Sequence, residues 1–335
     1  MEIDTILLKQ MIDEKMINVQ KHPSYDIYIY NYTKNCIFSH TWNEITLQCR
    51  GLILDKNLNV VARPLRKFFN YEELSEEQIP NLPYKIYDKI DGSMGILYWI
   101  NDVPYIATRG SFTSEQAIHA TKILHKKYLN VPFNKEYTYI FEIVYPEDIK
   151  VVDYKELDDI ILLAIINTKT GKEEDINLMK NYFILPEEYQ CNDYKELRNL
   201  FNGENKEGFV IKFENNYRIK LKFSEYFRIF SIKNFLTEKN IFDALINNKV
   251  NELYKLIKNT DEELRIFIDN IIQKYNNIYK EIENNALEVF KSKEFNTKKE
   301  AAEYFKQFKI APILFKMYDK SNYTNTIWNI IKKQL

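Results

Sequence analysis

The chain has 335 residues, of which 45% are hydrophobic and 28% are charged, and its formal net charge is −1 at pH 7. This balance is typical of folded globular proteins, and it excludes a disordered chain and a protein that attracts polyanions through its net charge. No apolar run approaches the roughly 20 residues that a membrane helix needs, and acidic residues interrupt the N-terminal segment MEIDTILLKQMIDEK, so we expect a cytoplasmic protein, or one in the host cytoplasm if the source is a virus.

The cysteines and the charge distribution give no sign of a structural metal or a basic tail. Cys36, Cys49 and Cys191 form no C-x-x-C pair, so we expect neither a zinc site nor a disulfide framework. Residues 231–335 hold 18 Lys and Arg against 14 Asp and Glu. A polyanion would therefore bind to a local patch of the chain.

The first two thirds of the chain show the two-residue period of β-strands. Short helical stretches separate these segments, and Thr113–Gln116 has the form of a capping box that opens one of them. We expect an α+β region with antiparallel sheets. The predicted strands are DIYIYNYT (26–33), GLILD (51–55), GILYWI (95–100), YTYIFEIVY (137–145), DIILLAII (159–166) and the two halves of GFVIKFENNYRIKLKF (208–223).

After about residue 230 the period changes to that of helices. Capping boxes at 260–263 and 297–300 predict helix starts. The sequence therefore predicts two domains, an α+β domain over 1–230 and an all-α domain over 231–335. The apolar positions that carry this period are Leu264, Ile268, Ile271, Tyr275, Ile278 and Ile282.

The segment YDKIDGSMG places Lys89, Asp91 and Gly92 between two apolar runs. A solvated lysine before a surface turn is one interpretation, and an active-site nucleophile is the other. If the segment is extended, Lys89 and Asp91 share a face. The K-x-D-G string alone does not decide between the two.

A second group of charges follows a predicted hairpin. Asn215 and Asn216 suit a two-residue turn, which would set Ile211 opposite Lys220 and Phe209 opposite Lys222. One face of this hairpin then carries two ammonium groups and a carboxylate among apolar residues, and the other is a core face. The predicted first face holds Glu207, Phe209, Ile211, Lys220 and Lys222, and the predicted core face holds Val210, Ile219, Leu221 and Phe223.

Other charges lie in apolar surroundings. Glu142 interrupts an apolar strand, where an unpaired carboxylate is costly, so it needs a partner such as a divalent cation or a ribose hydroxyl. The segment CRGLILDKNLNVVARPLRKFFNYEE interleaves cations with aromatic residues, which suits either a basic surface or phosphate recognition. Its cations include Arg50, Arg63, Arg66 and Lys67, and its adjacent aromatic residues are Phe68 and Phe69.

Taken together, these segments resemble the covalent nucleotidyltransferases, and most closely the ATP-dependent RNA ligases of the T-even bacteriophage tRNA-repair type. The resemblance covers about residues 40–230, with Arg109 where that family often has lysine. It rests on Cys49-Arg50-Gly51, A-R-P-L-R-K-F-F-N (62–70), the K-x-D-G string, Thr108-Arg109-Gly110-Ser111, Ser114-Glu115-Gln116-Ala117, the F-E strand, E-G-F-V-I-K (207–212) and the K-x-K string that ends at Lys222.

The resemblance implies a nucleotidyltransferase (ATP-grasp-like) domain in which Lys89 attacks the α-phosphate of ATP and becomes adenylylated. The AMP would pass to an RNA 5′-phosphate, and a 3′-hydroxyl would displace it. Lys220 and Lys222 would contact the α-phosphate and lower the pKa of Lys89. The resemblance also implies nucleotide contacts by Arg50, Lys67, Gly92 and Glu142, and it implies that Asp91 orients the amine or a metal-bound water. Glu207 and Glu142 would form a metal site for Mg²⁺, with Mn²⁺ as a substitute. Tyr226 would contact the active site, although a packed core tyrosine is an equally open interpretation.

Two alternatives remain at the level of sequence. One is an RNA-capping guanylyltransferase, although such enzymes follow the K-x-K strand with a β-rich barrel and residues 231–335 predict helices. The other is an RNA-binding relative without activity. By the resemblance, the partners are ATP and RNA with 5′-phosphate and 3′-hydroxyl ends, cleaved tRNA among them, and the helical domain either helps to choose the RNA or only packs on the catalytic domain.

Overall fold

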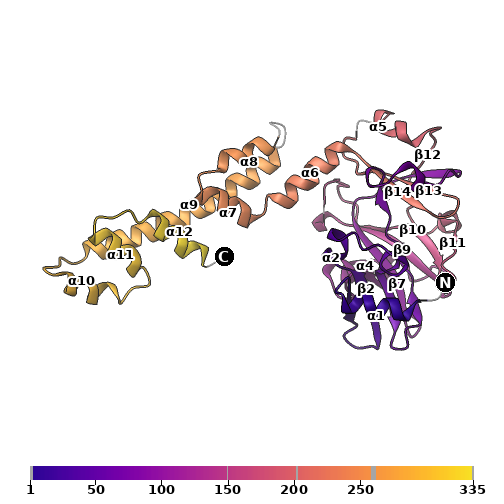
Figure 1. Cartoon of the computed structure of the whole chain (residues 1–335), viewed down its shortest axis with the longest axis horizontal. Coiled ribbons are helices and arrows are strands. Elements are labelled where there is room, and N and C mark those ends of the chain that lie inside the picture. Colours follow the sequence, from indigo (N-terminus) through magenta and orange to yellow (C-terminus); the bar gives the residue numbers. More distant parts are fainter. Residues whose placement is uncertain (1–2, 149, 201–202, 258–261, 334–335) are drawn as a thin grey trace. The chain divides into compact units, whose positions relative to one another are not determined.

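In the computed structural model, the chain forms two compact units, Met1–Phe227 and Arg228–Leu335 (Figure 1). The structure describes residues 3–148, 150–200, 203–257 and 262–333. The predicted α+β class is confirmed, because the first unit combines three sheets with helices and the second contains helices. The predicted boundary at residue 230 lies within α6 (Ser224–Phe235).

The first sheet of the N-terminal unit is antiparallel, in the order β1-β2-β3-β4. One of its faces packs against α1 and α3 through Leu8, Ile45 and Leu52. The N-cap of α1 is Asp4, whose carboxylate accepts hydrogen bonds from two backbone N–H groups of the first turn. The elements are α1 (Thr5–Asp13), β1 (Ile17–Lys21), β2 (Ile27–Tyr32), α2 (Lys34–Phe38), α3 (Glu44–Gln48), β3 (Arg50–Asp55) and β4 (Val60–Ala62).

The second sheet has the order β11-β10-β9-β7-β8 and is buried on both faces. One face packs on α4, where Leu124 meets Phe141 and Leu162. The other face packs on the first sheet through residues such as Ile53 and Ile140. The elements are β7 (Ser93–Ile100), β8 (Val103–Thr108), α4 (Glu115–Lys127), β9 (Tyr137–Val144), β10 (Asp159–Asn167) and β11 (Glu173–Glu174).

The third sheet has the order β12-β6-β13-β14-β5 and carries its own core. Its strands pair antiparallel, except that β14 pairs parallel with β5. The loop from β6 to β7 therefore joins the third sheet to the second. The elements are β5 (Phe69–Asn70), β6 (Tyr84–Asp88), β12 (Glu188–Tyr189), α5 (Leu197–Leu200), β13 (Gly208–Phe213) and β14 (Arg218–Lys222).

The predicted register of the β13–β14 hairpin is wrong by one residue. The structure pairs Val210 with Lys220 and Phe209 with Leu221, because the turn has three residues and Asn216 adopts φ 64° at its end. Phe209 and Ile211 therefore lie on the core face with no exposed surface. Lys220 and Lys222 keep the opposite face, which Val210 shares.

The predicted start of α4 is also one residue early. Ser114, not Thr113, is the N-cap, and its hydroxyl accepts a hydrogen bond from the Ala117 N–H. Thr113 instead donates its backbone N–H to the Ser111 hydroxyl. This hydrogen bond holds Thr113 in the loop that precedes the helix.

The second unit forms one apolar core from helices. The predicted apolar stripe lies on α9, where Ile268, Ile271 and Tyr275 are buried. Thr297 caps α10 as predicted, and the box at 260–263 includes residues outside those described. No described helix is long and apolar enough to cross a membrane. The helices are α7 (Glu238–Ile246), α8 (Val250–Leu256), α9 (Glu262–Lys291), α10 (Lys298–Phe305), α11 (Ala311–Tyr318) and α12 (Thr324–Lys332).

Candidate active site

Lys89 lies in the loop that joins the second and third sheets, and its ammonium group contacts a buried carboxylate. Its Nζ donates to Glu207 Oε2 at 2.8 Å. The Lys222 Nζ approaches the other oxygen, Glu207 Oε1, at 2.5 Å. Only 3% of the Glu207 side chain is exposed. One carboxylate therefore holds two of the predicted site lysines together.

The expected low pKa of Lys89 is not found. Burial lowers the pKa of Lys89, but the Glu207 and Glu142 carboxylates more than offset this effect, so the pKa is raised above its ordinary value. Burial likewise raises the pKa of Glu207, and the two lysines reverse that effect and lower it. Lys89 is therefore protonated until Glu207 is drawn away from it.

Four further cations gather beside this pair, and we call Arg50, Lys67, Arg109 and Lys220 the cation cluster. The Arg50 guanidinium lies 5.3 Å from the Phe68 ring, and the Lys220 Nζ lies 5.4 Å from the same ring. Lys67 donates to the Phe68 carbonyl oxygen at 3.1 Å. In the described part of the chain none of these four side chains forms an ion pair with a carboxylate. The cluster therefore gathers cations that no carboxylate contacts directly, although Glu142 attracts Arg50 and Glu73 attracts Lys67 from farther away.

The cation cluster shifts the pKa values of its own lysines. Burial, followed by repulsion from Lys67, Lys89 and other cations, lowers the pKa of Lys220 to about 6. Burial lowers the pKa of Lys67 to about 8, and Arg50 and Arg109 contribute to that shift. The lysine with the most strongly lowered pKa in this site is therefore Lys220, and not Lys89 as expected. A bound polyphosphate would relieve this repulsion.

Asp91 does not lie on a strand beside Lys89, as the sequence suggested. It follows β6 in the joining loop, and its Oδ2 accepts the backbone N–H groups of Val151 and Val152 at 2.8 and 3.0 Å. Its Oδ1 accepts the Tyr226 hydroxyl at 2.7 Å. Asp91 is buried, with 6% of its surface exposed, and so is Tyr226 with 3%. These contacts anchor the loop that carries Lys89.

Gly92 and Glu142 meet at the end of the same loop. The Gly92 N–H donates to Glu142 Oε1 at 3.2 Å. A Cβ atom at Gly92 would lie 2.4 Å from the Ile143 carbonyl oxygen, so packing against β9 already requires glycine. Burial raises the pKa of Glu142 to about 7, although Lys89 opposes the shift.

The carboxylates fit a divalent cation only as part of a larger ligand set. No group of three or more His, Cys, Asp or Glu among the described residues could hold a metal ion. Glu142 and Glu207 act on the same lysine, so they offer two carboxylates to one place. Mg²⁺ commonly takes one or two carboxylates and completes its shell with phosphate oxygens and water. The donor set therefore fits an ion that arrives with a nucleotide.

Two aromatic residues that the sequence did not single out complete the cation cluster. The Arg109 guanidinium lies 5.2 Å from the Tyr32 ring and donates to its hydroxyl at 3.2 Å. Trp42 packs edge-on against Tyr32, and the Lys67 Nζ lies 5.4 Å from the Trp42 ring. The alternation in DIYIYNYT places Tyr32 on a strand, but nothing local in the sequence connects it with Arg109.

Arg63 and Arg66 have other partners. Buried Arg63 donates to the Thr168 carbonyl oxygen at 3.0 Å and to Gln48 Oε1 at 2.9 Å. Arg66 pairs with Glu44 at 2.9 Å. Arg63 therefore stabilises the packing of the first two sheets.

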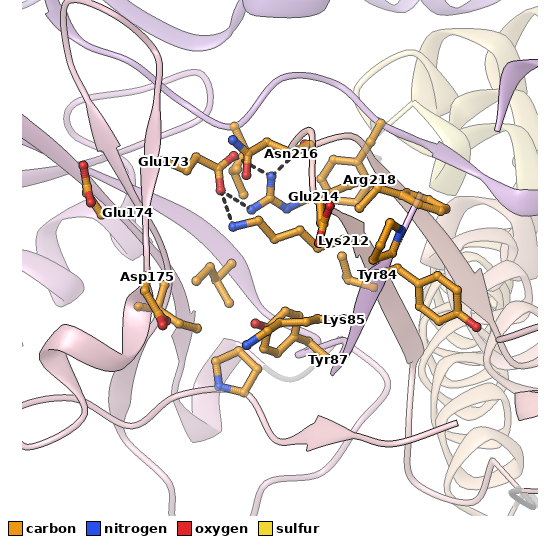
Figure 2. Close-up of a pocket in the computed structure, with 18 of the residues that line it drawn as sticks. Tyr84, Lys85, Tyr87, Glu173, Glu174, Asp175, Lys212, Glu214, Asn216 and Arg218 are labelled. Atoms are coloured by element: carbon orange, nitrogen blue, oxygen red, sulfur yellow. Dashed lines mark hydrogen bonds and ion pairs between the residues drawn. The ribbon is translucent and has the colours of Figure 1, made fainter. Parts of the chain in front are cut away.

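A cavity of about 490 Å³ lies between the second and third sheets, and Figure 2 shows the side chains around it. Phe68 lines this cavity and also contacts the cation cluster, so the two are neighbours. The lining has three cationic side chains against five carboxylates. Its apolar part includes Leu65, Phe68, Tyr87, Leu163, Ile176 and Val210.

Two viral relatives are similar to this chain in sequence. An RNA ligase from Rhodothermus phage RM378 is 25% identical, and the match covers 68% of this chain and 69% of that protein. A protein of Autographa californica nuclear polyhedrosis virus, described as a bifunctional polynucleotide kinase/RNA ligase, is 27% identical over 246 residues. These cover 62% of this chain and 34% of that protein, so the chain spans about a third of its length.

Solved structures give weaker similarity. An archaeal ATP-dependent RNA ligase matches 91% of this chain and 86% of its own with a TM-score of 0.49 and 12% identity. A TM-score at this level carries no argument about function. The family model described as RNA ligase, in contrast, matches residues 48–228, which is more than half of the chain and includes Lys89, Glu142, Glu207, Lys220 and Lys222. The chain therefore belongs to the RNA ligase family.

Proposed function

We propose that this RNA ligase uses ATP to join RNA 5′-phosphate and 3′-hydroxyl ends, and that Lys89 carries the AMP. The observation that supports this most is the shared carboxylate, with Lys89 and Lys222 on the two oxygens of Glu207 beside four cations without carboxylate partners. The phosphates of a nucleotide would supply negative charge to these cations. Such a site holds the phosphates and stabilises the charge that develops during transfer.

The cation cluster and the cavity beside it together indicate how ATP would lie. The cation cluster attracts phosphates, whereas the cavity beside it has more carboxylates than cations and would repel them. The apolar part of the cavity suits a nucleobase, and its volume lies in the usual range for small ligands. Tyr87 lines the cavity only two residues before Lys89. The base would therefore enter the cavity, with the α-phosphate at Lys89.

The first step then needs a neutral Lys89. Phosphates at the cation cluster and competition for the Glu207 carboxylate would weaken the hydrogen bond that keeps Lys89 protonated, and Glu207 lies in position to accept its proton. The Lys89 nitrogen forms a bond to the α-phosphorus, and the bond from that phosphorus to the bridging oxygen breaks. Pyrophosphate leaves with the electron pair of that bond.

Glu142 and Glu207 would hold a divalent cation together with the nucleotide, and Mg²⁺, or Mn²⁺ in its place, suits these oxygen ligands. When bound, such an ion neutralises phosphate charge during transfer. Arg50 and Lys67 would hold the phosphates, and Lys220 and Lys222 would act at the α-phosphate. The hydrogen bonds of Asp91 and Tyr226 support a positioning role for both, since they fix the loop that carries Lys89.

The steps can be separated by supplying the intermediate. We expect Lys89→Ala to lose joining of 5′-phosphate RNA with ATP but to keep sealing of RNA that is already 5′-adenylylated, because the nucleophile serves only the first step. The readout is conversion of labelled RNA on a denaturing gel. Full joining with ATP by this variant would refute the assignment of Lys89.

Labelled nucleotides test the capping alternative. We expect wild-type protein to become labelled by α-labelled ATP and not by GTP. Labelling by GTP alone would favour a guanylyltransferase, and labelling by neither would favour an RNA-binding protein without activity.

Cleaved tRNA is the natural RNA that the bacteriophage resemblance suggests. Competition between tRNA halves and unrelated RNA ends tests this choice.

A further inference from the structure

A buried ion-pair network crosses one wall of the cavity in Figure 2, and we call Glu173, Lys212 and Arg218 the clamp. The Arg218 guanidinium donates to both oxygens of Glu173, at 2.6 and 2.5 Å. The Lys212 Nζ lies 2.9 Å from Glu173 Oε2. Only 7% of the Glu173 side chain and 8% of the Arg218 side chain are exposed. Lys212 ends the E-G-F-V-I-K segment, whereas Glu173 and Arg218 lie outside the segments that carry the RNA ligase resemblance.

The clamp joins two sheets that share no strand pairing. Glu173 belongs to β11 in the second sheet, whereas Lys212 and Arg218 belong to β13 and β14 in the third. The cavity lies between these sheets, and all three side chains line it. Its width on this side is therefore fixed by the contact between Glu173 and its two partners.

The clamp also separates two cavities. A second cavity of about 550 Å³ is lined by Lys67, Arg66 and other residues, and Glu173 and Arg218 line both cavities. Loss of the Glu173 carboxylate would leave Lys212 and Arg218 facing each other as like charges. The contact that ties β11 to the third sheet would then be lost, and nothing in the clamp would hold the cavity at its present width.

The chemistry of the pair favours a fixed geometry. Arginine binds a carboxylate through two parallel hydrogen bonds, so both distance and orientation are set, which a lysine cannot do. Burial raises the pKa of Glu173, but Arg218 and Lys212 more than offset this and lower it. The carboxylate therefore stays ionised, and the contact persists at neutral pH.

We propose that the clamp is a positioning device that holds the two sheets at the spacing with which the cavity grips the nucleobase of ATP. The inference rests on the proposed function, because it assigns the base to this cavity. It predicts that the clamp contributes to binding of nucleotides that carry a base. It also predicts no contribution to binding of phosphates alone, which occupy the cation cluster.

Two ligands separate these contributions. One is an ATP analogue with a methylene group between the α and β phosphorus atoms, which cannot transfer AMP, and the other is inorganic tripolyphosphate. Titration calorimetry of full-length protein measures both dissociation constants. In Glu173→Gln we expect binding of the analogue to weaken by about tenfold or more, because a buried pair is broken, and binding of tripolyphosphate to stay within about twofold.

Matched variants make the result specific. Asp159→Asn changes a buried carboxylate on β10 of the same sheet, which lines neither cavity and bonds to Lys127 and Tyr128, and it should leave both dissociation constants unchanged. Arg218→Lys keeps the charge but loses the two-pronged contact, so it should weaken binding of the analogue by less than Glu173→Gln does. If Glu173→Gln does not fold, as its thermal unfolding would show, the Arg218→Lys comparison decides.

Three outcomes would overturn the clamp proposal. The first is equal weakening of binding for both ligands, which indicates general structural damage. The second is unchanged binding of the analogue in the folded clamp variants. The third is failure of the wild-type protein to bind the analogue. The proposed function fails separately, if wild-type protein binds the analogue but never becomes adenylylated by ATP. In that case the clamp can still be judged from the two dissociation constants.

Discussion

The Lys220 amine is buried among cations, and this position lowers the stability of the folded chain. Its pKa of about 6 is far below that of an exposed lysine, so the unfolded chain binds a proton that the folded chain does not hold at neutral pH. The free energy of unfolding therefore rises with pH between about 6 and the ordinary pKa of lysine, because the unfolded chain binds the additional proton over this range. Below about pH 6, Lys220 lowers the free energy of unfolding by its full amount. A residue retained at such a cost is typical of a functional site.

Replacing Lys220 should therefore separate stability from activity. We expect Lys220→Met to raise the free energy of unfolding by on the order of 2 kcal/mol at pH 7 and to abolish adenylylation by ATP. This gain in the free energy of unfolding should shrink as the pH approaches the ordinary pKa of lysine. Thermal unfolding at several pH values measures it, with exposed Lys239→Met as the control. A less stable Lys220→Met protein at pH 7 would contradict the low pKa.

Phosphate binding should return protons to the cation cluster. The pKa of Lys67 is about 8 and that of Lys220 about 6, and nearby phosphates raise both. We expect binding of the methylene ATP analogue at pH 8 to take up protons. Calorimetry in buffers of different ionisation enthalpy measures the number of protons taken up on binding. It should fall in Lys220→Met, and proton release by the wild type would contradict the account.

At the scale of elements, the strand edges and turns bring the site residues together. Lys220 and Lys222 leave β14 on one face, Lys89 follows β6, and Glu142 lies on β9. The two-residue period predicted β9 and β14 correctly, but the sequence did not single out β6 as a strand. It did not predict the hairpin register, because the turn length depends on Asn216 adopting a left-handed conformation, which the Asn-Asn pair alone does not determine.

The corrected cap of α4 gives a test at this scale. Ser114 accepts a hydrogen bond from the Ala117 N–H and exchanges one with Thr108 at 3.0 Å. We expect Ser114→Ala to lower the free energy of unfolding by about 1 kcal/mol. Thr113→Ala should have almost no effect, and denaturant unfolding compares the two. A larger loss for Thr113→Ala would restore the cap that the sequence suggested.

Long-range contacts explain what the sequence could not provide. Family motifs and charge placement identified Lys89, Glu207, Lys220 and Lys222, and the structure brings these four together. Asp91 was expected to face the amine, but its carboxylate accepts hydrogen bonds from Val151, Val152 and Tyr226, far along the chain. The clamp was missed for the same reason, since Glu173 and Arg218 are 45 residues apart.

On the scale of the molecule, the two units have separate apolar cores. The buried residues of the second unit form one cluster, which shares no member with the clusters of the first. All residues proposed for nucleotide chemistry lie in the first unit. The chain therefore has a structural basis for dividing AMP transfer from choice of RNA, which we propose as the role of the helical unit.

A truncated chain tests this division. We expect residues 1–235, which end with α6, to become adenylylated within about tenfold of the full-length rate, because the catalytic unit keeps its own cores. Discrimination between tRNA halves and unrelated RNA ends should decrease. The full-length chain is the control in both assays. Unchanged discrimination would show that the helical unit only stabilises the protein.

The central claim is that Lys89 becomes covalently bonded to AMP. Mass spectrometry of the intact protein after incubation with ATP and Mg²⁺, followed by peptide mapping, tests it directly. The account predicts one AMP adduct per chain, located on Lys89. An absent adduct, or an adduct on Lys220, Lys222 or any other residue, would contradict it.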